Sequence, residues 1–403
     1  MTSFDSSPTF NAWRALLALA VVFVLLATTG WTAIRHHRGD TDLRTASLAA
    51  WASGGIDGRA LPEAGSPPDR LARFFAGLTA AQRARLVDRY PLVVGNLNGV
   101  PLTLRYRANH RALAQARKVE RARMRDERLT STGRQTAQRR EQRFTSLMAE
   151  GRQILAFDPV GSGRVAEVFG DLGRAERVSV VVPGVDTNVV NFERTRRRYT
   201  APVGMAKSLY AAERATSPGT RTAVIAWADY TSPVGVGMDA AIGRLAREGS
   251  KRLDSLVRAL PGDSKVSLFC HSYGSVVCGI AAPSLPPRVA DIAVAGSPGM
   301  RVESAKQLRT GARVWATRDH DDWIKDVPYL AVGGLGHGAD PMTPEFGARV
   351  VSASGAVGHT GYFEPGTTSL ANFAGIGVGS YSTVRCAGDD GGCRSGISGA
   401  EAN

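Results

Sequence analysis

A serine in a tight turn between two apolar stretches is the first residue of this sequence whose setting suggests chemistry. The apolar run KVSLFC (265–270) ends in the turn HSYG (271–274), and small and aliphatic residues then recur at helical spacing. A strand that turns sharply into a helix over a serine raises the hydroxyl above the edge of a sheet. We therefore predict that Ser272 is a catalytic nucleophile.

The residue two positions before Ser272 departs from the usual G-x-S-x-G pattern of such a turn. Strand and helix nearly touch there, so the positions two before and two after the serine must be small. Gly274 meets this requirement fully, and Cys270, which is small and apolar, meets it in part. We interpret Cys270 as a packing residue and not as the nucleophile.

A serine nucleophile needs a base, and the chain offers seven histidines. In a fold built around this kind of turn, the base stands on a loop after the last strand. His359, in the glycine-rich segment GAVGHTGYF (355–363), follows the predicted strand 348–354 and fits that place. His337 comes one connection earlier and is expected to line the pocket or the surface.

The acid that orients the base should follow the preceding strand, residues 313–317. The segment RDHDDWI (318–324) holds three acids there, and we rank Asp322 first, Asp321 second and Asp319 third. Asp322 leads because an acid, one residue and then isoleucine resembles the usual acid turn. The resulting chain order is serine, acid, histidine, as this kind of hydrolase carries its triad.

The oxyanion of an acyl-transfer intermediate needs backbone donors. One is the N–H of Tyr273, and the other is expected from the turn PGVD (183–186), where Gly184 lets the chain approach a substrate carbonyl and Val185 donates. This chemistry requires no metal and no organic cofactor, and we predict neither. The four cysteines have no C-x-x-C zinc pattern and are too few for a disulfide-dense scaffold.

The elements that position these residues follow from hydrophobic periodicity. Strands are predicted at 153–159, 163–170, 178–184, 222–228, 265–270, 291–297, 313–317 and 348–354, and helices at 205–214, 239–260 and 369–374. Strands that alternate with helices indicate an α/β fold, with a mostly parallel sheet and helices on both faces. The first two strands form a hairpin, which predicts a mixed edge.

The most apolar stretch of the chain lies near its N-terminus. Residues 15–34 carry no charge, and a helix of that length reaches about 30 Å, the thickness of a bilayer's hydrocarbon core. A cleaved signal peptide fits less well, because its apolar run is usually about 7–15 residues long. We predict a single-pass membrane anchor after a tail of residues 1–14.

Two observations bear on the side of the membrane that the rest of the chain faces, and they disagree. The arginines just after the span, Arg35, Arg38 and Arg44, favour a cytoplasmic position. Cys386 and Cys393 bracket a short acidic loop, and a disulfide between them would favour an oxidising, extracytoplasmic compartment. The side of the membrane therefore stays open.

Composition divides the rest of the chain. We predict a linker with at most one short helix at 35–68, an Arg-rich helical segment at 69–152, the catalytic domain at 153–385 and a flexible tail at 386–403. The helical segment holds much of the formal net charge of +14, and most of its arginines are interpreted as a solvated face. Of the binding alternatives, anionic lipid headgroups fit better than nucleic acid, because aromatics are nearly absent between Arg107 and Arg143.

Residues 71–379 resemble the alpha/beta-hydrolase family catalogued as domain of unknown function 1023. The resemblance rests on FFAGLTAAQRARLVDRYPLVVGNLNGVPLTLRYRANH before the catalytic domain, and on VVVPGVDTN, CHSYGS, GSPG and GHTGYF within it. It implies an alpha/beta-hydrolase fold, with the nucleophile on Ser272 and the base on His359. Members typically carry glycine at the position of Cys270, and the family's substrates are largely undefined.

These observations predict a membrane-anchored serine hydrolase that cleaves an acyl bond, of the ester type, in a small-molecule or lipid substrate. The loops YTSPVGVGM (230–238) and GGLGHGADPM (333–342) have the composition of pocket walls or a lid. The alternative is a catalytically inactive hydrolase-like domain that serves as a membrane-tethered binding scaffold.

Overall fold

The computed structural model of this chain describes residues 41–388 and 391–397. The predicted tail 1–14 and membrane anchor 15–34 lie outside the described residues, so the anchor stays a prediction. Within the part of the chain that is described, no helix is both long and apolar enough to cross a membrane.

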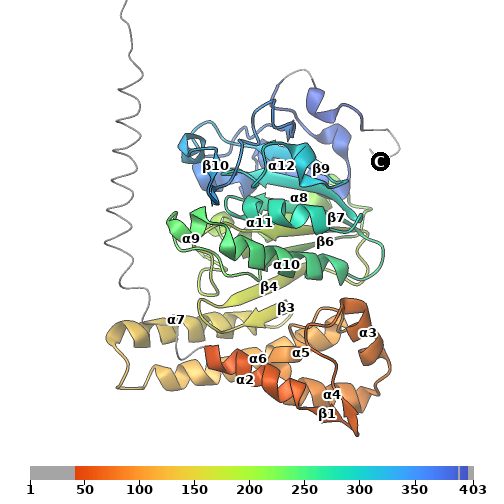
Figure 1. The fold of residues 1–403 in the computed structure, drawn as a ribbon, viewed down its shortest axis with the longest axis vertical. Helices are drawn as coiled ribbons and strands as arrows, with labels where there is room; N and C mark the ends of the chain where they lie inside the picture. Colours follow the sequence, from red (N-terminus) through yellow and green to blue (C-terminus); the bar gives the residue numbers. More distant parts are fainter. Residues whose placement is uncertain (1–40, 389–390, 398–403) are drawn as a thin grey trace, which may run out of the picture.

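An eight-stranded sheet forms the body of the protein, in the order β12-β9-β8-β7-β5-β6-β4-β3. Its strands are β3 (Gln153–Asp158), β4 (Arg164–Gly170), β5 (Arg177–Val182), β6 (Thr222–Ala228), β7 (Lys265–His271), β8 (Val289–Ala295), β9 (Arg313–Thr317) and β12 (Arg349–Val350). β4 runs antiparallel to both of its neighbours, and the remaining pairs are parallel. The carboxyl ends of the parallel strands therefore meet at one edge, which Figure 1 shows facing α9 (Met238–Ala241) and β10 (Ala331–Val332).

Helices cover both faces of this sheet. α10 (Arg244–Arg258) and α11 (Gly274–Ala281) pack on one face, and α8 (Pro202–Thr216) and α12 (Thr368–Val378) pack on the other (Figure 1). Within β5, Val180 joins the core of the first face and Val181 joins that of the second. A strand buried on both sides has no polar alternation, which is why its sequence is a continuous apolar run.

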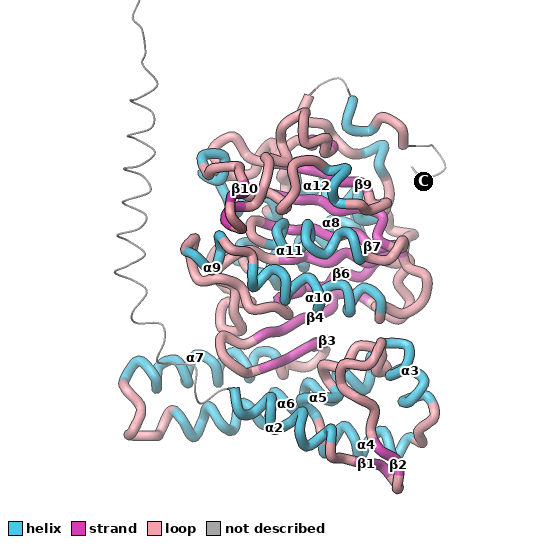
Figure 2. The backbone as a smooth tube through the Cα atoms, in the orientation of Figure 1, coloured by secondary structure: helices cyan, strands magenta, loops and turns pink. Residues whose placement is uncertain are grey.

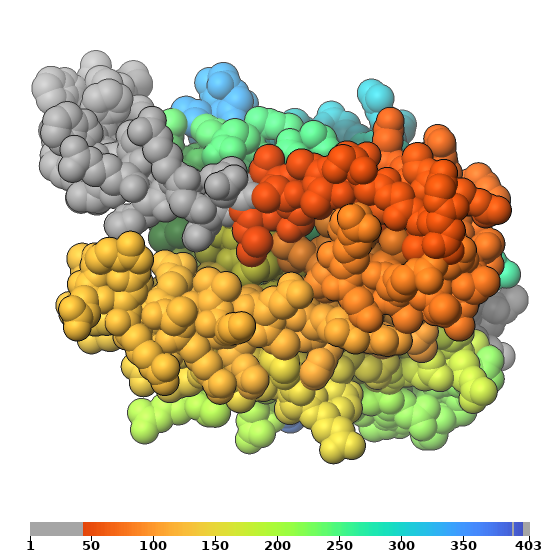
Figure 3. Space-filling model, turned by 90° about the horizontal axis from the view of Figure 1, so that it is seen from below, coloured from red at the N-terminus to blue at the C-terminus, as the bar shows by residue number. Residues whose placement is uncertain are grey.

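A separate helical layer lies against the β3 edge of the sheet, as Figures 2 and 3 show from two directions. It consists of α2 (Thr41–Ala52), the hairpin β1 (Gly55–Ile56) and β2 (Arg59–Ala60), α3 (Pro68–Ala76), α4 (Ala80–Arg89), α5 (Pro91–Val94), α6 (Leu102–Arg123) and α7 (Ser131–Leu147). Its own core includes the buried side chains of Trp51, Phe75 and Leu86. α4 begins with a capping box in which Thr79 and Gln82 each bond the other's backbone N–H.

Two asparagines of this layer seal the exposed edge of β3. The Asn96 side chain accepts from the Phe157 N–H at 3.1 Å and donates to the Phe157 carbonyl at 2.7 Å. Asn109 donates to the Ile154 carbonyl at 2.9 Å. An open strand edge invites pairing with other chains, and these contacts occupy backbone groups of β3 that would otherwise be available for it.

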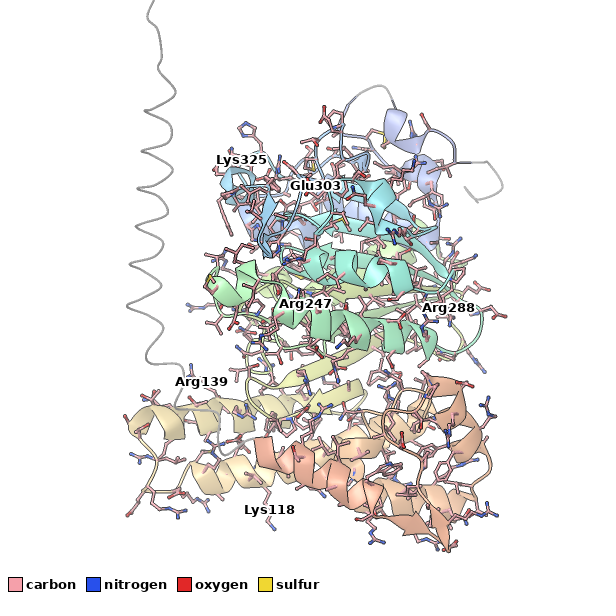
Figure 4. All side chains as sticks on the ribbon, viewed as in Figure 1. Lys118, Arg139, Arg247, Arg288, Glu303 and Lys325 are labelled. Atoms are coloured by element: carbon pink, nitrogen blue, oxygen red, sulfur yellow. A yellow bond between two sulfur atoms is a disulfide. The ribbon has the colours of Figure 1, made fainter. Side chains whose placement is uncertain are left out.

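Several arginines of the helical layer are structural and not solvated. Arg140 pairs with Glu120 at 2.7 Å between α7 and α6, and both side chains are buried. Arg143 pairs with Glu193 at 3.0 Å, which joins α7 to the loop after β5. Others, such as Lys118 and Arg139, point away from the body into solvent (Figure 4).

The observed elements differ from the expected ones mainly where glycine or a polar turn interrupts a pattern. The helix predicted over 239–260 is split at Gly243, which has φ 63°, into α9 (Met238–Ala241) and α10. The segment predicted as a linker holds the one helix allowed for it, α2, whose Trp51 lies in the layer's core, and it also holds the hairpin of β1 and β2, which was not predicted. Of the strand predicted over 348–354, only β12 pairs with β9, and Val351 forms an isolated antiparallel bridge with Cys386.

Candidate active site

The proposed nucleophile stands in a strained turn. Ser272 has φ 53° and lies between the end of β7 and the start of α11. A non-glycine residue with positive φ is costly, and it persists only when its surroundings fix it. Here the Ser272 N–H donates to the Ala295 carbonyl of β8 at 2.9 Å, which ties the turn to the neighbouring strand.

Close packing around the turn explains why its flanking residues are small. A Cβ added at Gly274 would lie 2.3 Å from the Val182 carbonyl oxygen, so only glycine lets α11 approach β5. A Cβ added at Gly184 would lie 2.7 Å from the Ser272 Cβ, so the loop after β5 passes directly over the serine. Both glycines were singled out from the sequence for close approach.

Cys270 is buried, as a packing residue would be, but it is also joined to Cys278 by a disulfide. The sequence analysis did not predict this bond. Its Cα atoms are 6.5 Å apart, within the range that a disulfide spans. The bond ties the end of strand β7 to the middle of α11, and the serine turn lies between the two cysteines. The spacing of the two cysteines could have predicted this bond. They are eight residues apart, one on the strand and one on the helix that flank a tight turn, so the turn brings them together.

The structure brings Ser272, His359 and Asp322 together at the carboxyl edge of the sheet. Ser272 Oγ lies 2.8 Å from His359 Nε2, and His359 Nδ1 lies 2.8 Å from Asp322 Oδ1. His359 belongs to the 3-10 turn η6 (Gly358–Phe363), and Asp322 caps η5 (Trp323–Asp326). The carboxylate accepts at Nδ1, so the neutral imidazole presents Nε2 to the serine as an acceptor.

Asp322 is held ionised by donors that surround its carboxylate. Burial raises the pKa of Asp322, but hydrogen bonds from His359, from the Tyr362 hydroxyl and from the Ile324 N–H outweigh burial, so that pKa lies below its ordinary value. Burial, together with the hydrogen bond to Asp322, raises the pKa of the Tyr362 hydroxyl far above its usual range. Tyr362 therefore acts as a hydrogen-bond donor to the acid.

The two lower-ranked acids do not touch the His359 ring. Asp319 accepts from the backbone N–H of Gly358 at 2.8 Å and so holds the histidine loop by its main chain. Asp321 is exposed and lies beside His320. The three neighbouring acids thus have three different environments, which their spacing in the sequence does not distinguish.

His271 contacts the catalytic constellation in a way that the sequence analysis missed. Its Nε2 lies 2.6 Å from the backbone carbonyl oxygen of His359, and the two ring centroids are 4.8 Å apart. Burial and the neighbouring His359 lower the pKa of His271 to about 3. The ring is therefore neutral at ordinary pH, and its Nε2–H donates to the carbonyl. The sequence shows His271 only as part of the serine turn. Its contact with His359, 88 residues later, depends on the fold and has no sequence signal.

Gly296 lies directly behind the acid and the base. It has φ 54°, and a Cβ there would come 2.7 Å from Asp322 Oδ2 and 3.1 Å from His359 Nδ1. The residue belongs to the GSPG motif, which was quoted for the family resemblance without a role. This position, directly after β8, explains why the motif begins with glycine. Any side chain there would displace Asp322 from His359.

The predicted oxyanion donors are free in the structure. Neither the N–H of Tyr273 nor that of Val185 donates to an acceptor among residues 41–388 and 391–397. Asp186, with φ 59°, bends the chain just after Val185, and its N–H donates to the Pro233 carbonyl at 2.8 Å. The loop after β6 therefore fixes the loop that carries the second donor.

His337 is buried beside the site and takes no part in the hydrogen-bonded chain. Its ring lies 5.9 Å from that of Tyr273, and burial with the nearby Arg301 lowers the pKa of His337 to about 4. Its burial rules out the predicted surface position, and its place in the wall of a substrate pocket stays a prediction. In the described part of the chain, no group of three or more His, Cys, Asp or Glu side chains is arranged to hold a metal ion.

A cavity of about 190 Å³ lies far from the serine, between α2 and the β3 side of the sheet. Its charged side chains pair with one another, as in Arg252 with Asp229 at 2.6 Å and Arg44 with Asp158. These pairs neutralise the lining, and Ser272, His359 and Asp322 are not part of it, so we assign the cavity no part in the serine chemistry.

The strand order, the antiparallel β4 and the serine turn after β7 define the alpha/beta-hydrolase fold. A family model described as alpha/beta hydrolase matches residues 158–332, which include Ser272 and Asp322 but not His359. The fold and this match support a hydrolase. The finer designation, domain of unknown function 1023, stays a prediction.

Relatives among curated proteins come from mycobacteria. The uncharacterized protein Rv2079 of Mycobacterium tuberculosis is 26% identical over 382 residues, which covers 79% of this chain and 57% of that protein. The uncharacterized protein Rv0963c of the same species is 31% identical over 167 residues, which covers 39% of this chain and 62% of that protein. The chain thus spans little more than half the length of the first relative.

Among solved structures, the chain is similar to a dienelactone hydrolase from Anabaena variabilis. The sequence identity is 16%, the TM-score is 0.32, and the match covers 53% of this chain and 88% of the other.

Proposed function

We propose that the protein is a serine hydrolase that cleaves a carboxylic ester through Ser272, His359 and Asp322. The observation that carries the proposal is the unbroken hydrogen-bonded chain from the serine Oγ, through both ring nitrogens, to a buried carboxylate. The same three residue types, in the same roles, activate serine in unrelated hydrolases.

In the acylation step, His359 Nε2 takes the Ser272 proton as Oγ attacks the ester carbonyl carbon. Asp322 accepts from Nδ1–H throughout, so it holds the ring orientation and stabilises the imidazolium that forms. His359 then gives its proton to the leaving alkoxide. The products of this step are a free alcohol and an acyl group on Ser272.

In the deacylation step, His359 takes a proton from water, and the hydroxide attacks the acyl carbon. The tetrahedral intermediate collapses, Ser272 Oγ recovers the proton, and the carboxylic acid leaves. We assign the oxyanion in both steps to the N–H groups of Tyr273 and Val185, which have no acceptor among the described residues. One such donor contributes roughly 10²–10³-fold to the rate.

The proposed substrate is a small-molecule or lipid ester that is met at a membrane. The predicted anchor at 15–34 would hold the catalytic domain close to a bilayer. A lipid substrate then needs only to reach the carboxyl edge of the sheet. Ester is preferred to amide because an alkoxide leaves more readily.

A series of p-nitrophenyl esters from acetate to palmitate tests this function. We expect turnover by the full-length protein in mild detergent, and a loss of at least about a thousandfold in Ser272→Ala. Ser284→Ala, on the exposed turn after α11, is the matched control and should keep wild-type activity. Folded wild type without turnover would instead favour the alternative, an inactive binding scaffold.

A further inference from the structure

Exposed apolar side chains gather at the edge of the sheet that carries Ser272. Ten large hydrophobic residues are exposed in the described part of the chain, and eight lie on loops after β6, β9 and β12. Six of them form what we call the apolar rim: Val234, Val236, Met238, Leu330, Val332 and Leu335. Val236 is 72% exposed and Val332 is 68% exposed, so neither packs on the body. Isolated exposed apolar residues are ordinary, but their concentration on one edge is not.

The apolar rim comes from two segments, residues 234–238 after β6 and residues 330–335 after β9, and Arg301 contacts the structure beside both. Arg301 donates to the Gly334 carbonyl at 2.8 Å, within the turn between β10 (Ala331–Val332) and β11 (Leu335–Gly336). The same guanidinium lies against Gly243 after α9, where a Cβ would come 2.3 Å from its Nη1. Figure 2 shows α9 and β10 on the same side of the molecule, among the loops.

The apolar rim continues to the proposed base. Trp323 is 46% exposed, and its ring centroid lies 4.7 Å from that of His359. Val357, two residues before His359, is 77% exposed. A surface that met these side chains would therefore lie over the entrance to the serine.

A cluster of arginines without acidic partners lies at the same edge. The loop after β5 contains ERTRRR (193–198), in which Arg194, Arg196, Arg197 and Arg198 are all exposed. No ion pair to any of the four occurs within the described residues, and Arg198 lies only over the ring of its neighbour Tyr199. Because β5 runs parallel to β6 and β7, its carboxyl end and this loop lie on the edge that holds the serine.

We propose that the apolar rim and the arginines of 194–198 form one surface by which the catalytic domain contacts an anionic lipid bilayer. Valine, leucine and methionine side chains gain from entering the headgroup-acyl boundary, and free arginines pair with lipid phosphates. The chain upstream supports this occupant, because only six residues separate the apolar segment 15–34 from the start of α2. The inference rests on the proposed function, since it places a lipid ester at the mouth of the site.

An environment-sensitive fluorophore on a single new cysteine tests the contact. All four native cysteines are in disulfides, so Val236→Cys provides the only free thiol. The full-length chain, carrying Ser272→Ala to prevent turnover, is reconstituted into phosphatidylcholine vesicles with and without phosphatidylglycerol. The matched control is Asp263→Cys, exposed on the turn between α10 and β7 next to Arg288, on the opposite side of the body (Figure 4).

The expected result is a blue shift and quenching by spin-labelled lipid at position 236, stronger with phosphatidylglycerol, and no change at position 263. No response at 236, or an equal response at both positions, would overturn the inference. So would a blue shift in detergent without bilayer lipid, because it would place a second copy or residues 15–34 on the rim. These readouts need no catalysis, so their failure is distinct from a failure of the esterase assay.

Neutralisation of the exposed arginines tests the preference for anionic lipid. Replacement of Arg194, Arg196 and Arg197 by glutamine should raise, at least about twofold, the fraction of anionic lipid needed for half-maximal quenching at position 236. The control is Lys118→Gln with Arg139→Gln, two exposed basic residues of the helical layer (Figure 4). An equal effect of the two sets would assign the preference to net charge and overturn the role of this loop.

Discussion

His271 donates its Nε2–H to the backbone carbonyl of His359 at 2.6 Å, so the proposed base is held by its main chain as well as by its ring. Asp322 holds the other end of the same residue through Nδ1. Two independent contacts thus fix the His359 ring opposite Ser272. Since a displacement of about 1 Å can cost on the order of a hundredfold in rate, such contacts matter as much as the reacting groups.

Removal of the His271 donor should lower kcat and leave KM nearly unchanged. We expect a loss of about 10- to 100-fold in His271→Leu, because the ring of His359 is less well fixed. His271→Gln keeps an N–H at a similar reach and should recover most of the activity. Steady-state kinetics on one p-nitrophenyl ester distinguish this positioning role from a fold defect, in which both variants would fail alike.

A side chain at Gly296 should separate the acid from the base. Gly296→Ala places a methyl group within 2.7 Å of Asp322 Oδ2 and adds strain at φ 54°. We expect kcat to fall by about a hundredfold and the free energy of unfolding to fall by about 1–3 kcal/mol. Gly311→Ala is the control, because nothing lies within 4 Å of its added Cβ. Equal activity of the two variants would contradict the assignment of Asp322 and His359 as the catalytic acid and base.

The three neighbouring acids should differ sharply in kinetics. Asp322→Asn is expected to lower kcat by about 10⁴-fold, because an amide there favours the wrong tautomer of His359. Asp319→Asn loosens only the Gly358 N–H contact and should cost about tenfold. Asp321→Asn, on the exposed surface, should have no effect. A larger loss of kcat in Asp319→Asn or in Asp321→Asn than in Asp322→Asn would assign the role of the acid to that residue.

The Cys270–Cys278 disulfide should stabilise the serine turn locally. The bond closes a short loop, so Cys270→Ala with Cys278→Ala should lower the free energy of unfolding by about 2–3 kcal/mol. We also expect kcat to fall several-fold, because the positive φ of Ser272 loses one of its restraints. Cys386→Ala with Cys393→Ala removes the other disulfide, away from the serine turn, and should leave kcat unchanged. Urea unfolding and kinetics on both double variants check the difference.

Glu213 should make the protein less stable as pH rises. Burial, opposed by hydrogen bonds from Ser179 and Thr222, raises the pKa of Glu213 to about 8, from 4.5 in an exposed carboxyl. Between these values the folded state binds a proton that the unfolded state releases, so this contribution to stability is full below about pH 4.5 and is lost toward pH 8. Glu213→Gln should remove a fall of about 3 kcal/mol between pH 5 and 8. Urea unfolding at several pH values gives the slope, and parallel slopes for both proteins would refute the assignment.

The alternation of apolar strands and helices was enough to predict the sheet, its antiparallel start and the place of the serine turn. These features are local, since a run such as that of β5 is apolar because both of its faces are covered. Chain order and loop composition also ranked His359 and Asp322 first, and the structure places His359 beside Ser272 and Asp322 beside His359.

The remaining features depend on contacts between distant segments. Three contacts of this kind join residues that are far apart in the chain. They are the hydrogen bond from His271 to the His359 carbonyl, the close approach of Gly296 to Asp322, and the hydrogen bond from Asn96 to β3. Periodicity carries no information about such pairs. The free arginines of 194–198 were missed for the same reason, because only the fold shows that their loop lies at the serine's edge.

Covalent labelling by a fluorophosphonate, followed by mass spectrometry of the tryptic peptides, shows whether Ser272 is an activated nucleophile. We predict one phosphonyl group per wild-type chain, on Ser272, no labelling of Ser272→Ala, and labelling slowed at least about a thousandfold in His359→Asn. A folded wild-type protein that stays unlabelled, or that is labelled at another residue, would contradict this prediction.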